Sequence, residues 1–225
     1  MGFAERARTD AGAQVWIHQA DAEAARTGKP GWKNEGSTFS YLLRSAFYRT
    51  AFSLARGAVK IVPVKEVSSF GDGVVIDVPG SPRALHTPGH TPGSAAIAVE
   101  KRNALLTGDA MCTWNPYTGR VGPQIMPSAL NMSSAQAMAS LDALLAVTAG
   151  ILLPGHGDPF TQGIPEAGRR AQAAGRSQPA EPRQRPPACT PRRVGPGMHA
   201  PRAHPRARPP RRLPPHCLRT PKLVI

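Results

Sequence analysis

Three segments of the chain place metal-binding residue types directly after an apolar run and a glycine turn. They read Leu-His-Thr-Pro-Gly-His-Thr-Pro-Gly-Ser over residues 85–94, Leu-Leu-Thr-Gly-Asp over 105–109 and Leu-Pro-Gly-His-Gly-Asp over 153–158. Imidazole and carboxylate groups are donors that a borderline-soft cation such as zinc prefers. The sequence therefore points to a metal site built on His90, Asp109 and His156.

The segment over residues 85–94 predicts a stiff turn. It holds two Thr-Pro-Gly units, with His86 ahead of the first and His90 ahead of the second. Proline fixes φ and glycine permits positive φ, so each Pro-Gly pair makes a tight bend. We expect His90 to be held at a set angle by these bends, and we interpret His86 as structural.

Each candidate ligand also has a plainer interpretation. His90 and His156 could instead hydrogen-bond to loop carbonyls, and Asp109 could cap its own turn. Thr91 and Asp158, which adjoin the two histidine turns, are interpreted as groups that orient the ligands. Cys112 follows Asp109 by three positions and is interpreted as a small buried thiol.

The elements that must position these residues are short strands and amphipathic helices. Apolar runs bounded by Gly and Pro predict strands, and apolar residues recurring every three or four positions predict helices. The predicted helices are Gly2–Ala11, Asp21–Arg26, Ser37–Arg56, one capped by Ser133 or Ser134 and ended by Gly150, and Pro165–Ala174; the predicted strands are Gln14–His18, Val59–Val64, Val74–Val78, Ser94–Val99, Ala104–Thr107 and Ile151–Leu153, and Met111–Asn131 is a predicted loop. Ser37–Arg56 is interpreted as a helix that covers the core, with a substrate lid as the alternative. The alternation indicates an α/β fold, in which helices cover layers of sheet.

Charge and proline divide the chain into a folded body, residues 1–175, and a tail, residues 176–225. The body carries 16 Lys and Arg against 13 Asp and Glu, whereas the tail carries 12 against one and holds 13 of the 25 prolines. A segment of that composition buries too little apolar surface to offset its chain entropy, so the tail is predicted to be disordered. Read functionally, it would bind nucleic acid only nonspecifically, through phosphate contacts. Alternatively, it is a frameshifted or read-through extension of GC-rich coding sequence.

Cysteine content and hydropathy favour a cytoplasmic protein. The three cysteines do not form a disulfide framework, which fits a reducing compartment. Met1-Gly2 is followed by charged residues and not by the apolar run of a signal peptide. The most apolar stretch, residues 135–153, is broken by Asp142 and Gly150, so we expect no membrane span and no membrane partner.

Taken together, the three motifs resemble those of the metallo-β-lactamase superfamily of metal-dependent hydrolases, over about residues 1–175. The resemblance implies an αββα sandwich. It assigns His90 to a first metal, Asp109 to the catalytic bridge between two metals, and His156 to the second metal. It also implies two zinc ions, and a metal-bound hydroxide that attacks an ester, thioester, lactone or similar bond in a small-molecule substrate.

One departure from the family pattern qualifies that expectation. The family motif H-x-H-x-D-H, which supplies four of the seven protein ligands, is absent, and Gly2–Arg6 resembles the segment that follows it. We therefore expect an N-terminally truncated domain, the C-terminal portion of the sandwich, with at most two protein ligands for each metal. Weak metal binding, little or no activity, marginal stability, and uncovered strand faces such as Ala104–Leu106 would follow. The alternative functions are those of a catalytically inactive remnant that serves as a binding module, and of a nonspecific polyanion binder that acts through the tail.

Overall fold

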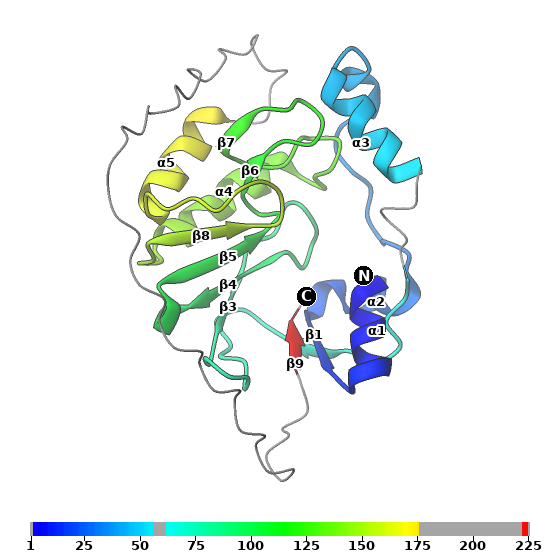
Figure 1. The fold of residues 1–225 in the computed structure, drawn as a ribbon, viewed down its shortest axis with the longest axis vertical. Helices are drawn as coiled ribbons and strands as arrows, with labels where there is room; N and C mark the ends of the chain where they lie inside the picture. Colours follow the sequence, from blue (N-terminus) through cyan, green and yellow to red (C-terminus); the bar gives the residue numbers. More distant parts are fainter. Residues whose placement is uncertain (1, 56–61, 176–221, 225) are drawn as a thin grey trace, which may run out of the picture. The chain divides into compact units, whose positions relative to one another are not determined.

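The computed structural model describes residues 2–55, 62–175 and 222–224 (Figure 1). All of these residues belong to one of the two units of the chain; the other unit, Glu181–Arg219, lies outside the described residues. The predicted disordered tail, residues 176–225, therefore also lies outside them, except for three residues that form a short strand. No helix within the described ranges is long and apolar enough to cross a bilayer.

Helices and strands alternate through the described ranges. The helices are α1 (Gly2–Ala11), α2 (Ala22–Thr27), α3 (Ser45–Ala55), α4 (Ser134–Leu145) and α5 (Ile164–Ala174), with 3-10 turns η1 (Gln19–Asp21), η2 (Thr38–Tyr41) and η3 (Glu100–Arg102). The strands are β1 (Gln14–His18), β2 (Ser68–Phe70), β3 (Arg83–His86), β4 (Ala95–Val99), β5 (Ala104–Gly108), β6 (Cys112–Trp114), β7 (Val121–Gln124), β8 (Ile151–Pro154) and β9 (Lys222–Val224). The predicted α/β class is confirmed.

The sheet that positions the three motifs has the strand order β3-β4-β5-β8. Strand β4 is antiparallel to β3 and to β5, and β5 is parallel to β8, so β3, β5 and β8 run in the same direction. Their carboxyl ends therefore lie at the same edge of the sheet. The residues that follow those ends are the turn with His90, Asp109, and the turn with His156. This topology explains how three motifs distant in sequence come to one place.

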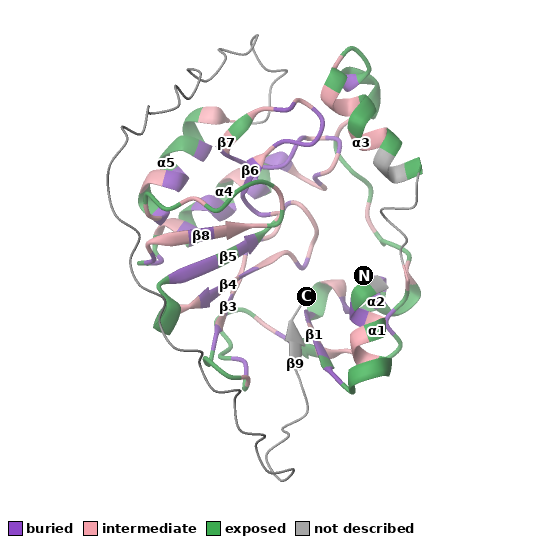
Figure 2. Ribbon diagram, viewed as in Figure 1, coloured by how far each residue is buried: buried purple, intermediate pink, exposed green. Residues whose placement is uncertain are grey.

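One face of this sheet is buried under α4 and α5 (Figure 2). The period of two along the strands turns alternate residues toward the helices. The resulting core consists mainly of Ala96, Ala98, Leu105 and Leu152 from the strands, Ala137, Leu141 and Leu144 from α4, and Ile164, Ala167 and Ala171 from α5. Burying each of the larger of these side chains contributes about 1.5–3 kcal/mol.

The opposite face of the same sheet is less well covered. Leu106 is 40% exposed, whereas Ala104 on the same face is 7% exposed, and Leu105, which points to the helices, is 0% exposed. The predicted uncovered strand face is therefore present at Leu106 but not at the other two residues. Toward the β3 side, Ile97 packs against a cluster built on Phe70 and Ile76, which covers part of this face.

A smaller sheet in the N-terminal part of the chain has the order β2-β1-β9, with both neighbours parallel to β1. Helix α1 packs on it through Ala4, which forms a cluster with Val15 and Val64. The strand β1 has the predicted bounds, Gln14–His18, and it ends in a buried histidine, His18. This segment becomes important at the candidate site.

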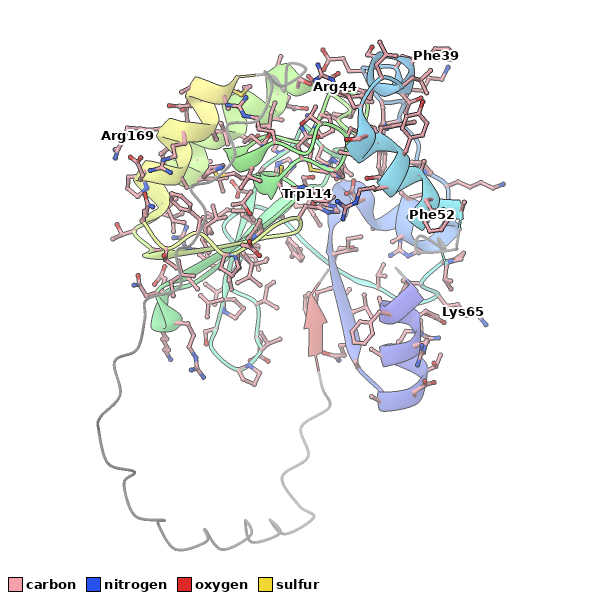
Figure 3. All side chains as sticks on the ribbon, turned by 45° about the horizontal axis from the view of Figure 1, so that its top comes forward. Phe39, Arg44, Phe52, Lys65, Trp114 and Arg169 are labelled. Carbon is pink, nitrogen blue, oxygen red and sulfur yellow. The ribbon has the colours of Figure 1, made fainter. Side chains whose placement is uncertain are left out.

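The predicted helix Ser37–Arg56 is wrong in its first part. The structure has the 3-10 turn η2 and a break at Leu42-Leu43 before α3 begins at Ser45. Tyr41 and Phe47 both contact the ring of Tyr117, with centroid distances of 5.2 and 5.3 Å. A single helix with one apolar stripe was expected to cover the core, but Leu43 is 99% exposed, and Phe39 and Phe52 also project outward (Figure 3).

Two further predictions are corrected by the tertiary pairing. The predicted loop Met111–Asn131 contains the antiparallel pair β6 and β7. The predicted strand Val74–Val78 is reduced to a single bridge between Val75 and Arg83. The predicted strand Val59–Val64 lies partly outside the described residues, and its described part, residues 62–64, is irregular. Short strands of this kind depend on their partners more than on local pattern.

Candidate metal centre

The structure brings His90, Asp109 and His156 together. The distance from His90 Nε2 to Asp109 Oδ2 is 3.4 Å, and that from His156 Nε2 to Asp109 Oδ1 is 3.5 Å. Each imidazole therefore faces a different oxygen of one carboxylate. The three side chains are 22%, 26% and 40% exposed, in the order His90, Asp109 and His156, so small molecules can reach them.

The turn that carries His90 packs tightly against the start of α4. Gly89 has φ +135°, and a Cβ there would collide with the backbone of Ala137. The backbone amides of Met132 and Ser133 donate to the carbonyls of His90 and Gly89 at 3.1 and 2.9 Å. The first Thr-Pro-Gly unit therefore needs glycine both for its backbone conformation and for this close approach.

The turn that carries His156 is held by its neighbours in the sheet. Gly155 N donates to the carbonyl of Gly108 at 2.8 Å, and Thr113 N donates to the carbonyl of His156 at 2.9 Å. A Cβ on Gly155 would collide with Asp109 Oδ1. The glycine of the Pro-Gly-His motif thus leaves room for the Asp109 carboxylate.

The residues interpreted as orienting groups make different contacts. Thr91 donates through Oγ1 to Asp21 Oδ2 at 2.5 Å. Asp158 is exposed, and its backbone carbonyl accepts a hydrogen bond from Thr113 Oγ1 at 2.6 Å. That either residue orients a metal ligand directly stays a prediction.

His86 and Cys112 make structural contacts. The His86 ring stacks on the buried His18 ring with a centroid distance of 4.1 Å, and its Nε2 donates to the carbonyl of Pro92 at 2.8 Å. Cys112 is a buried free cysteine, and burial, together with the charge of Asp109, raises the pKa of its thiol to about 12. It is therefore a neutral thiol at physiological pH, which confirms the interpretation from sequence.

The three side chains are of the types that bind metal, but they are fewer than a metal centre normally has. Within the described ranges, no group of three or more His, Cys, Asp or Glu side chains is placed to hold one ion. A cation beside Asp109 would therefore have two candidate protein ligands, the carboxylate and one imidazole, whereas a catalytic zinc normally has three. In addition, His90 Nδ1 is buried without a hydrogen-bond partner, although metal-binding histidines usually donate from their second ring nitrogen.

Comparison with known proteins identifies the family. The family model described as the metallo-beta-lactamase superfamily matches residues 9–156, about two thirds of the chain. The chain belongs to the metallo-beta-lactamase superfamily. Members of this superfamily bind divalent metals and are generally metal-dependent hydrolases. No match was found among curated proteins.

Several solved structures are similar to the chain. A family protein of Thermus thermophilus is 24% identical, with 72% of this chain and 52% of that chain covered and a TM-score of 0.45. An archaeal superfamily protein of Sulfolobus tokodaii is 15% identical, with 76% and 60% covered and a TM-score of 0.47. A protein solved in a di-iron-bound form is 20% identical, with 72% and 66% covered and a TM-score of 0.42. The chain thus spans about half to two thirds of the length of these structures.

Sequence reasoning missed one residue that contacts this candidate site. Asp21 contacts the turn of His90 through both carboxylate oxygens, at Thr91 Oγ1 and Gly93 N. Its place directly before a short helix predicts a helix cap. Nothing in the local pattern connects it with a turn seventy positions later.

Proposed function

We propose that the chain carries part of the active centre of a metal-dependent hydrolase that acts on an ester, thioester, lactone or similar bond of a small molecule. The proposal rests on one observation, the placement of His90 Nε2 and His156 Nε2 beside the two oxygens of Asp109. A carboxylate flanked in this way by imidazoles is suited to bridge two cations, for which we propose zinc. Because the chain spans only part of its structural relatives, the activity of the whole protein is included in this proposal.

The three residues would have distinct tasks. His90 and Asp109 would hold one cation, and His156 and Asp109 the other. A cation held there would supply a water molecule that loses its proton near neutral pH. Asp109 would keep the two positions close together, and the partly exposed His156 would face the entering substrate.

The shortage of donors supports a second proposal, that this chain is an inactive remnant which serves as a binding module. Two protein ligands for each position predict weak metal binding, and a catalytic zinc normally has three. The exposed strand residue Leu106 and the exposed aromatic residues of η2 and α3 would be available for contacts with another molecule. Metal binding separates the two proposals.

The test combines metal binding with hydrolysis on the full chain. Zn²⁺ or Co²⁺ affinity is measured by calorimetry for the natural chain and for Asp109→Asn and His90→Ala, with Asp142→Asn on α4 as a control for the loss of a carboxylate. We expect Asp109→Asn to weaken binding by at least about 100-fold, because loss of even an outer hydrogen-bond partner costs about 10–100-fold. Asp142→Asn should leave the affinity unchanged.

A panel of ester, thioester and lactone substrates completes the test. Hydrolysis that depends on added metal and disappears in Asp109→Asn and His90→Ala supports the hydrolase. Hydrolysis that persists in both variants, or in the presence of a chelator, contradicts metal chemistry at this site. A natural chain that binds neither ion favours the inactive remnant.

A further inference from the structure

Both oxygens of the Asp21 carboxylate are engaged by the turn that carries His90. Asp21 Oδ2 accepts a hydrogen bond from Thr91 Oγ1 at 2.5 Å, and Asp21 Oδ1 accepts one from the backbone amide of Gly93 at 2.7 Å. Hydrogen bonds to an ionised acceptor are about twice as strong as neutral ones. The residues on the C-terminal side of His90 are thus tied to one side chain of the N-terminal segment.

Asp21 makes this contact in place of a local one. It occupies the N-cap position of α2, where aspartate is among the preferred residues because its carboxylate can accept from the first helical amides. Its side chain makes no such bond to α2. The carboxylate is therefore directed to the turn and not to its own helix.

The glycine of the second Thr-Pro-Gly unit, Gly93, leaves room for the side chain of Asp21. Gly93 is buried, and a Cβ on it would lie 2.6 Å from Asp21 Cγ. Unlike Gly89, it does not have a positive φ. Glycine is thus required at this position by the approach of Asp21 and not by the backbone conformation.

The direction of the His90 ring depends on this turn. His90 Nδ1 is buried without a hydrogen-bond partner, so no bond from that nitrogen orients the imidazole. On one side the backbone of the turn is held by Met132 and Ser133, and on the other by Asp21 through Thr91 and Gly93. Loss of either support would allow the imidazole to move relative to Asp109.

We propose that Asp21 is a positioning residue of the candidate metal centre. By holding Thr91 and Gly93, it sets the direction in which His90 presents Nε2 to the Asp109 carboxylate. The inference rests on the proposed function only in treating His90 as a working ligand, because the contacts themselves require no metal.

The first test observes the histidine rings of the full chain without metal. Histidine is labelled with ¹⁵N and ¹³C, and the ring signals of His90 and His156 are assigned by their loss in His90→Gln and His156→Gln. Spectra of the natural chain and of every variant are recorded in the same buffer at the same pH, so that differences between them report the substitution alone. We expect Asp21→Ala to shift the His90 signals and to leave those of His156 in place.

Two control variants separate positioning from general destabilisation. Glu23→Ala removes an exposed carboxylate two residues away in the first turn of α2. Val15→Ala loosens the N-terminal core without touching the turn. Both should leave the His90 signals unchanged, and a shift of His90 in Val15→Ala as large as that in Asp21→Ala would overturn the proposal.

Milder variants keep the test decisive if Asp21→Ala does not fold. Asp21→Asn retains one acceptor oxygen, and Thr91→Val removes one of the two donors. Each should shift the His90 signals in the same direction as Asp21→Ala, by a smaller amount. Unchanged His90 signals in both of these variants would also overturn the proposal.

Metal binding gives an independent readout. We expect Asp21→Ala to lower Co²⁺ affinity by about 10-fold, the lower end of the loss seen when outer supports of metal ligands are removed, and Glu23→Ala to have no effect. If the natural chain binds no Co²⁺, the proposed function fails, whereas the ring signals of the metal-free chain still decide the role of Asp21.

Discussion

The two histidine turns face the same carboxylate but are held in different ways. The turn of His90 is supported from two distant segments, by Asp21 on one side and by Met132 and Ser133 on the other. The turn of His156 is supported by the adjacent strands, through bonds to Gly108 and Thr113. The imidazole of His90 is 22% exposed and that of His156 is 40% exposed.

This difference separates two ways of positioning a histidine side chain. His156 follows a strand that pairs directly with β5, so its place next to Asp109 follows from the register of two strands. His90 lies on a longer turn, and its place requires contacts with residues about seventy positions before it and about forty after it. The position of His90 is therefore expected to be more sensitive to changes elsewhere in the chain.

The largest effect is expected from Gly89→Ala. The new Cβ would collide with the backbone of Ala137, and alanine would have to adopt φ +135°, so we expect a loss of about 4 kcal/mol or more in the free energy of unfolding. Gly122→Ala is the matched control, because Gly122 has φ +109° but no heavy atom within 4 Å of a Cβ. It should cost only the backbone strain, about 1–3 kcal/mol.

Urea denaturation measures both glycine variants. Equal losses in the two variants would show that the packing of the His90 turn against α4 contributes little beyond backbone strain.

A smaller loss of stability, of similar size for the two turns, is expected when one hydroxyl group beside each turn is removed. Ser140 on α4 donates to the carbonyl of Pro88 at 2.7 Å, and Thr113 on β6 donates to the carbonyl of Asp158 at 2.6 Å. Ser140→Ala and Thr113→Val should each lower the unfolding free energy by about 1 kcal/mol. In histidine-labelled samples, Ser140→Ala should shift the His90 ring signals and Thr113→Val those of His156. The opposite pattern would contradict the separate support of the two turns.

The smallest effect on stability is expected from acidification. It acts through His18, whose ring stacks on His86 at the start of the His90 turn. Burial, followed by the neighbouring His86, lowers the pKa of His18. In the unfolded chain His18 binds its proton at about pH 6.5. Its contribution to the free energy of unfolding is therefore complete above that pH, and it is lost as the pH falls through the lower pKa of the folded chain. The charges of Asp21 and Asp72 partly oppose the shift, which keeps the effect small.

The measurement compares unfolding midpoints of the natural chain and of His18→Asn between about pH 7.5 and about pH 5.5. Asparagine keeps an acceptor for the amide of Ala20 but does not titrate in this range. The variant should lose less stability on acidification than the natural chain. An identical pH dependence in both chains would show that His18 does not contribute.

Much of the candidate site could be predicted from sequence because its candidate ligands lie in short, local patterns. Asp109 and His156 each follow an apolar strand and a glycine, and these strands were predicted within one or two residues as β5 and β8. The supports could not be predicted in this way. Asp21 has the local pattern of a helix cap, and the contact that it makes instead depends on the packing of β1 and α2, which meet through Ile17, Ala22 and Ala25.

The same contrast holds for the fold. Periodicity placed α1, β1 and α5 close to their observed bounds, because each buries a regular stripe or alternation. It placed the start of α4 but not its end, because the helix stops at Leu145 and not at Gly150. Periodicity failed for the region 37–56. Tyr41 on η2 and Phe47 on α3 both pack on Tyr117, and the chain between η2 and α3 is not helical as expected. Contacts between aromatic side chains far apart in sequence override local propensity there.

The sequence by itself determined the residue types that can bind metal and the strand ends that carry them, because glycine turns and apolar alternation act over a few neighbouring residues. Only the tertiary structure decided that β3, β5 and β8 run in the same direction and so bring His90, Asp109 and His156 to one edge. It also decided that Asp21 holds the His90 turn. Strand pairing and side-chain contacts of this range depend on which surfaces meet in the folded chain, and no local pattern specifies them.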